Sequence, residues 1–168
     1  MLRKAILILA VAIIAIPALA EPVLKIGSPP PPLTLPNLKG ENVSLESRLA
    51  GKVTVIVFFT SWSKSCQEEI IWLKKLAARQ DLQVIGVSFD RKVAPLNDFI
   101  KANNITFEVL HDKKLKALKD YRILIIPTLF IFDQAGNLKN IYVDFDGNTK
   151  KAVSADIKKL LPAGNPAI

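Results

Sequence analysis

Residues 53–66 read VTVIVFFTSWSKSC, and this stretch decides the fold class. Residues 53–60 are β-branched and aromatic with almost no polar side chain, which is typical of a strand buried on both faces of a largely parallel sheet. The helix predicted next has one apolar stripe at helical spacing, formed by Cys66, Ile70, Leu73 and Ala77. The chain is therefore expected to pass from a buried strand, through a short turn, into an amphipathic helix.

Helices and strands are predicted to alternate along the rest of the chain. The strands are expected at 82–89, 107–110, 125–132 and 138–143, and the helices at 95–103, 114–121 and 150–161. The last two strands form an antiparallel hairpin, and a shorter edge hairpin is expected before the core, at 33–35 and 43–45. This order predicts an α/β fold with a central mixed β-sheet flanked by helices and an N-terminal edge hairpin.

The N-terminus has the pattern of an export signal. Arg3 and Lys4 precede an apolar run, and Ala18-Leu19-Ala20 supplies a small-x-small cleavage pattern. We therefore predict a signal peptide at 1–20 and a periplasmic or secreted mature protein. Membrane attachment is expected only if the signal stays uncleaved, and the apolar run of residues 5–20 is shorter than the roughly 20 residues that a span needs.

The mature chain is predicted to be a single domain at 33–161. A Pro-rich lead-in at 21–32, with four consecutive prolines, is expected to act as a stiff spacer before it. A flexible tail is expected at 162–168.

Composition argues against several classes of partner. The full sequence has 23 basic and 15 acidic residues, and removal of Arg3 and Lys4 with the signal leaves the mature chain a formal charge of +6. The lysines are spread over several predicted helices without interleaved aromatic residues, which indicates solvated faces and no nucleic-acid partner. His111 is the only histidine and is expected at a strand end on the surface, so neither a metal site nor a cofactor is predicted.

Two short motifs carry a family resemblance. Trp62-Ser63-Lys64-Ser65-Cys66 at the first strand-to-helix junction and Ile126-Pro127-Thr128 at the opening of a later strand resemble the W-C-x-x-C motif and the cis-proline of the thioredoxin superfamily. The resemblance narrows to the exported TlpA/ResA-like (redoxin) thiol-disulfide oxidoreductases, whose P-x-F-x-L-x-x-L opening is similar to residues 31–38. Gly51-Lys52, Glu69, Asp112 and the 133–136 turn match that branch as well.

The motif is degenerate, because it reads S-x-x-C. The resemblance implies an attacking cysteine at position 63 and a resolving cysteine at 66, but Ser63 can neither form nor receive a disulfide. It also implies that Glu69 handles protons near the inner thiol. The predicted function is therefore binding of a protein partner or peptide segment in a groove. The residues expected to form it are Trp62, Lys64, Ile126, Pro127 and Thr128.

Alternatives remain for the cysteine and the serines. Cys66 lies on the inward stripe and fits an inert buried residue, while Ser63 or Ser65 is expected to cap the helix, with residues 65–68 matching the S-x-x-E capping box. The enzymatic alternative is a one-cysteine peroxidase that resembles the peroxiredoxin T-x-x-C motif and uses Cys66. The proline expected before such a motif is Phe59 here, and Arg122 belongs to a different segment from the assisting arginine. A third interpretation is that Ser63 was introduced into an ordinary oxidoreductase.

Overall fold

The computed structural model describes residues 24–161. In chain order the elements are β1 (Thr34–Pro36), β2 (Asn42–Ser44), the short 3-10 helix η1 (Glu46–Arg48), β3 (Val53–Phe59), α1 (Lys64–Leu76), β4 (Leu82–Ser88), α2 (Val93–Ala102), β5 (Glu108–His111), α3 (Lys116–Asp120), β6 (Thr128–Phe132), β7 (Leu138–Val143) and α4 (Gly147–Leu160). The predicted signal peptide at 1–20 and tail at 162–168 lie outside the described residues. Within 24–161, no helix is both long enough and apolar enough to cross a membrane.

Five strands form the central sheet in the order β5-β4-β3-β6-β7. β3 pairs in parallel with β4, and β4 in parallel with β5, whereas β6 runs antiparallel to both β3 and β7. β3 lies in the middle, and all seven of its residues are buried, as its run of β-branched and aromatic residues predicts. The antiparallel hairpin of β1 and β2 forms a second, two-stranded sheet. The predicted α/β class with a mixed sheet and an N-terminal hairpin is therefore confirmed.

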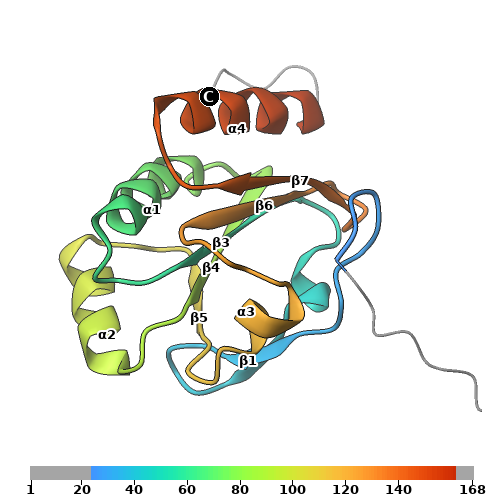
Figure 1. Cartoon of the computed structure of the whole chain (residues 1–168). Coiled ribbons are helices and arrows are strands. Elements are labelled where there is room, and N and C mark those ends of the chain that lie inside the picture. The colour runs from blue at the N-terminus through green and yellow to red at the C-terminus, as the bar shows by residue number, and fades with distance from the viewer. Residues whose placement is uncertain (1–23, 162–168) are drawn as a thin grey trace, which may run out of the picture.

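The two faces of the central sheet are covered by different elements (Figure 1). Helices α1, α2 and α4 pack on one face, where they contribute Ile70, Leu96 and Val153 to the core. The β1-β2 hairpin and α3 pack on the other face. Because successive strand residues point to opposite faces, Val57 joins the first core and Phe58 the second.

Several elements begin at other residues than predicted, and the largest shifts, of three residues each, are at β6 and α4. β6 starts at Thr128 instead of 125, since Pro127 has no N–H group to donate to a neighbouring strand. The helix α4 starts at Gly147 instead of 150, because the side chain of Asp146 accepts a 2.7 Å hydrogen bond from the backbone N–H of Thr149 and so caps an earlier turn.

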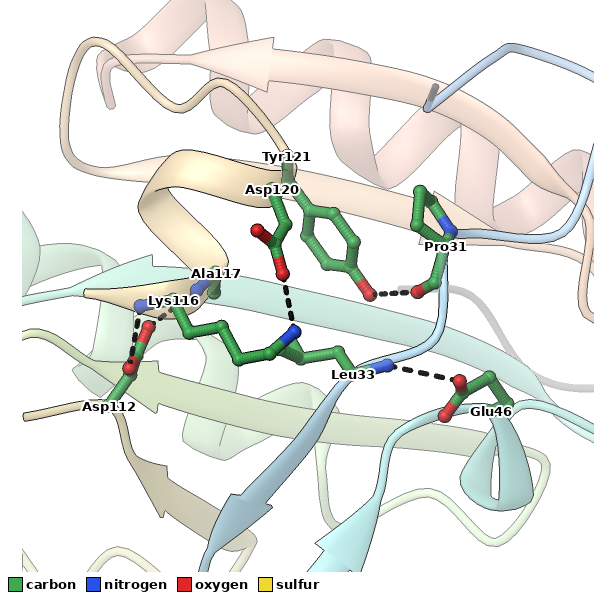
Figure 2. A network of polar contacts seen from close by, with 8 residues as sticks. All are labelled: Pro31, Leu33, Glu46, Asp112, Lys116, Ala117, Asp120 and Tyr121. Carbon is green, nitrogen blue, oxygen red and sulfur yellow. Dashed lines mark hydrogen bonds and ion pairs between the residues drawn. The ribbon is translucent and has the colours of Figure 1, made fainter. Parts of the chain in front are cut away.

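The described part of the predicted Pro-rich lead-in packs against the domain. Pro30 and Pro31 are buried. The hydroxyl of Tyr121 donates a 2.8 Å hydrogen bond to the carbonyl of Pro31, and the N–H of Leu33 donates to Glu46 Oε1 at 3.0 Å (Figure 2). Proline has no N–H group, so a run of prolines supplies no backbone donors of its own, and the carbonyl oxygen of Pro31 accepts from a side chain of the domain instead.

Asp112, which matches the family pattern, has a structural role in the same region. Its carboxylate accepts hydrogen bonds from the backbone N–H groups of Lys116 and Ala117, at 2.9 and 2.6 Å (Figure 2). The aspartate is 1% exposed and so satisfies two donors at the start of α3 that have no partner within that helix.

Candidate functional site

The predicted motif lies where β3 ends and α1 begins, close to the start of β6 and the end of β7. The connection is made by Asp144, the first residue after β7. Its N–H donates a 2.8 Å hydrogen bond to the carbonyl of Pro127, and its Oδ1 accepts a 3.3 Å hydrogen bond from Ser65 Oγ. One aspartate therefore joins the S-x-x-C motif to the proline, whose bond to Ile126 is cis.

Ser63 stands at the N-cap position of α1 but does not cap it with its side chain. Its backbone is extended, and its carbonyl accepts the first intrahelical bond from the N–H of Gln67 at 2.9 Å. The Ser63 hydroxyl instead lies against the Cys66 thiol. The predicted capping box is wrong as well, because α1 starts at Lys64 and Ser65 therefore lies inside the helix. The hydroxyl of Ser65 donates a hydrogen bond to Asp144 instead.

Cys66 is fully buried under the helix. Burial raises the pKa of its thiol, and the nearby Glu69 raises it further, while hydrogen bonding from Thr60 and Ser63 opposes the rise without cancelling it. Thr60 Oγ1 is itself buried and has no hydrogen-bond partner of regular geometry among the described residues. The thiol therefore sits among hydroxyl groups in a site that disfavours its thiolate.

Glu69 lies one turn further along α1 and is also buried, at 1% exposure. Burial, together with the negative charge of Asp144, raises the pKa of this carboxyl to about 8. Its Oε2 atom has no hydrogen-bond partner among the described residues. At neutral pH the side chain is therefore mainly protonated, and it can donate or accept a proton beside the thiol.

The residues predicted to bind a partner divide into an exposed and a buried group. The side chain of Trp62 is 74% exposed, and Lys64 is exposed too. Pro127 and Thr128 are buried and Ile126 half-buried, with Thr128 Oγ1 donating a 2.6 Å hydrogen bond to the carbonyl of Ile125. Only Trp62 and Lys64 thus present much of their side chains to solvent, and the Ile126–Thr128 segment contributes mainly backbone.

A buried aspartate that sequence reasoning missed fixes the turn before the motif. Asp90 follows β4, and its two carboxylate oxygens accept hydrogen bonds from the N–H and the hydroxyl of Ser61, at 2.9 and 2.8 Å. Ser88 Oγ also donates to this carboxylate, at 2.6 Å. Gln67 of α1 donates from its side chain to the carbonyl of Ser61 at 2.7 Å. The Ser61–Trp62 turn is therefore held from both β4 and α1.

Asp144 was also missed, although the sequence contains a signal for it. It is the first aspartate of the stretch Val143-Asp144-Phe145-Asp146-Gly147, and its φ angle is +64°. Aspartate is one of the few residues that adopt this left-handed conformation readily, so an aspartate directly after a strand indicates a turn of this kind. The stretch predicts the turn, but nothing in it indicates the contacts with Ser65 and Pro127.

The described part of the chain shows no group of side chains placed to hold a metal ion. Residues 24–161 contain no group of three or more histidine, cysteine, aspartate or glutamate side chains placed to hold a metal ion. His111, at the end of β5, is half-buried, and its Nε2 lies 2.7 Å from the carbonyl oxygen of Asp90.

A mixed five-stranded sheet with a tryptophan-led strand-to-helix motif beside a cis-proline defines a thioredoxin-like protein. Residues 26–141 match the AhpC/TSA family, and the chain belongs to that family. A crystal structure from Chlorobium tepidum, described as a thiol:disulfide interchange protein DsbE, has a TM-score of 0.76 and 27% identity, covering 83% of this chain and 99% of that one. The thioredoxin fold is thereby confirmed.

Two relatives of known class identify the branch of the family to which the chain is similar. Sporulation thiol-disulfide oxidoreductase A of Bacillus subtilis (strain 168) is 31% identical over 108 residues, or 61% of this chain and 64% of that protein, slightly less than two thirds of its length. Thiol-disulfide oxidoreductase ResA of Bacillus thuringiensis subsp. konkukian (strain 97-27) is 25% identical over 146 residues, or 84% of this chain and 82% of that protein. The predicted TlpA/ResA-like branch of the thiol-disulfide oxidoreductases is confirmed.

Proposed function

We propose that this chain is an exported, redox-degenerate member of the thiol-disulfide oxidoreductase family that binds an extended segment of a partner protein around Trp62 and Pro127. The observation that carries the proposal is the pairing of Ser63 with a fully buried Cys66. A hydroxyl cannot attack a disulfide, and a buried thiol with a raised pKa supplies little thiolate to do so in its place. Export rests on the signal pattern of residues 3–20.

The proposed binding surface does not depend on a cysteine at position 63. Trp62 places a large, rigid aromatic side chain in solvent, and such residues are enriched among those that dominate binding energies. The turn that carries it is fixed by the Asp90 bonds to Ser61, so little order is lost when a partner binds. A serine in place of cysteine at position 63 does not alter the surface around Trp62.

The first prediction concerns chemistry. The purified protein is expected to reduce insulin disulfides no faster than dithiothreitol alone, because position 63 has no thiol. Hydrogen peroxide is expected to leave Cys66 a free thiol, because the raised pKa keeps it protonated and burial keeps it from the oxidant. Insulin turbidity measures the first, and trapping of sulfenic acid with dimedone, followed by mass spectrometry, measures the second.

The Cys66→Ser variant is the matched blank for both assays, since it differs from the natural chain by one atom. Equal insulin rates for the two proteins support the proposal, and faster reduction by the natural chain overturns its redox-degenerate part. Rapid peroxide-dependent labelling of native Cys66 would establish the peroxidase alternative instead. Labelling of the urea-unfolded protein checks that the reagents work once the thiol is exposed.

The second prediction concerns binding. For the tightest peptide selected from a library of random displayed heptapeptides, Trp62→Ala is expected to raise the Kd about tenfold, which is the usual loss at a dominant aromatic contact. Isothermal titration calorimetry with the synthetic peptide measures the change. Ile26→Ala is the control, because Ile26 is 53% exposed and precedes Gly27, whose N–H bonds to the carbonyl of Leu138 at the far end of β7. Equal affinity for Trp62→Ala and the natural chain contradicts the proposed surface.

A further inference from the structure

A groove of about 230 Å³ opens on the sheet face that carries α3, next to the candidate site. Its floor and one side come from paired residues of β6 and β7, with Thr128 opposite Val143 and Phe130 opposite Ile141. The other side is the 121–125 segment between α3 and β6. Thr128 directly follows Pro127, so the groove extends the proposed binding surface to the outer edge of the sheet.

Apolar side chains remain in solvent around this groove. Leu124 is 93% exposed, and the other exposed members are Ile125, Ile141 and Val143. Exposed aliphatic residues gathered around a depression, instead of scattered singly, indicate an interaction surface. The apolar lining requires an occupant that also has an apolar side chain.

Arg122 gives the groove a charge. It is the one charged residue among the described residues that line the groove, and no ion pair links it to any residue within 24–161. Its φ angle is +53°, a left-handed conformation that costs a side chain about 1 kcal/mol and favours glycine. Arg122 lines an apolar groove and has no ion pair with residues 24–161, so its guanidinium is complementary to a carboxylate, which it can bind through two parallel hydrogen bonds.

The strand that forms one side of the groove has a free edge. β7 is the last strand of the sheet. On its outer side, the N–H of Leu138 donates to the carbonyl of Ser28 at 3.0 Å and the carbonyl of Leu138 accepts from Gly27 at 2.7 Å, while the N–H of Ile141 donates to Asn140 Oδ1 at 2.8 Å. No other described segment pairs with the outer side of β7, which leaves the end near Val143 open. Such an edge binds an extended segment through backbone hydrogen bonds.

We propose that this groove binds an apolar side chain of an extended partner segment, and that Arg122 binds a carboxylate of the same segment, from an acidic side chain or the C-terminus. The inference rests on the proposed function, because it names the chemistry of the partner that the Trp62 surface binds. Backbone pairing along the open end of β7 aligns the segment, the apolar contact supplies affinity, and Arg122 selects for an acid.

The test is a selection on the immobilised full chain with two random heptapeptide libraries, one displayed internally and one with a free C-terminus. We expect enrichment of an aliphatic or aromatic residue within two positions of an acidic residue or of the terminal carboxylate, and the library that enriches identifies which acid is bound. Arg122→Gln is expected to abolish the preference for an acid and to weaken the best synthetic peptide about fivefold. The Ile141→Thr, Val143→Thr double variant, which keeps β-branched residues in the strand, is expected to weaken it about tenfold.

Matched controls make the same chemical changes elsewhere. Val93→Thr alters an exposed valine of α2, and Arg91→Gln alters an exposed arginine that does not line the groove. Both are expected to bind as the natural chain does. An unchanged acid preference in Arg122→Gln, or equal losses in the groove variants and their controls, overturns the inference. Two further outcomes overturn the inference. One is a dimer in sedimentation velocity that the double variant abolishes, because a second copy then covers the groove. The other is adsorption to phosphatidylglycerol vesicles that the double variant abolishes, because a lipid surface then covers it.

The outcomes separate this inference from the proposed function. If Trp62→Ala weakens the peptide and the groove variants do not, the proposed surface stands and the groove proposal fails. If the groove variants weaken it and Trp62→Ala does not, the groove stands and the surface around Trp62 fails. If neither library enriches any peptide, both fail.

Discussion

Ser63→Cys is expected to convert the chain into a dithiol protein whose two sulfur atoms form a disulfide under mild oxidation. The hydroxyl that it replaces already lies against the Cys66 thiol, one turn away at the start of α1. A thiol at this helix N-terminus should have a pKa at or below about 7, because the helix dipole stabilises its thiolate. Free-thiol titration should fall from two thiols to none on oxidation, and insulin reduction should rise above the background of the natural chain.

Ser65→Cys is the matched control for this gain of function. It also adds one thiol beside Cys66, but its side chain is directed toward Asp144. Adjacent residues have Cα atoms about 3.8 Å apart, below the usual range for disulfides of about 4.4 to 6.8 Å, so this variant should keep both thiols free. Two free thiols in oxidised Ser63→Cys would show that the residue at position 63 does not face Cys66.

Glu69→Gln is expected to remove a large pH dependence from the free energy of unfolding. The folded chain holds this carboxyl proton up to a pKa of about 8, whereas the unfolded chain releases it near 4.5. Between these values the folded state binds more protons than the unfolded state, so the stability of the natural chain falls as the pH rises from 4.5 to 8 and levels off above that. The full loss is on the order of 5 kcal/mol. Urea unfolding at a series of pH values measures it.

Glutamine keeps the size of the side chain but cannot ionise. The free energy of unfolding of the variant should therefore rise steadily relative to that of the natural chain over this pH range. Glu68→Gln is the control, because it makes the same change at the neighbouring exposed position. Asp144→Asn should reduce the dependence without abolishing it, since burial is the larger cause of the shift. Parallel profiles for Glu69→Gln and the natural chain would mean that Glu69 ionises normally in the fold.

Local pattern was enough to predict the central part of the fold and the outline of the site. The β-branched and aromatic run of residues 53–60 predicted a strand with both faces covered, and β3 is that strand. The helical spacing of Cys66 and Ile70 placed the thiol inward, and both are fully buried. These features depend on residues close together in the chain, and composition and periodicity report on such residues directly.

Boundaries and burial were predicted less well where a tertiary contact outweighs local preference. Ser65 matched a capping box, but Asp144 binds its hydroxyl within the helix. Glu69 is buried beside the thiol, although a charged residue is seldom buried without a partner. The prolines before the domain matched a spacer, but Tyr121 binds the carbonyl of Pro31 across the sequence.

The sequence alone determined the thioredoxin-like class, the serine at position 63 and the inward position of Cys66. Only the tertiary structure showed that burial, together with Asp144, raises the pKa of Glu69, that Asp90 fixes the turn before Trp62, and that Arg122, with no ion pair to residues 24–161, lines an apolar groove. The physical reason is that each of these contacts joins segments far apart in the chain. Their proximity follows from strand order and helix packing, which leave no periodic signal in the local sequence.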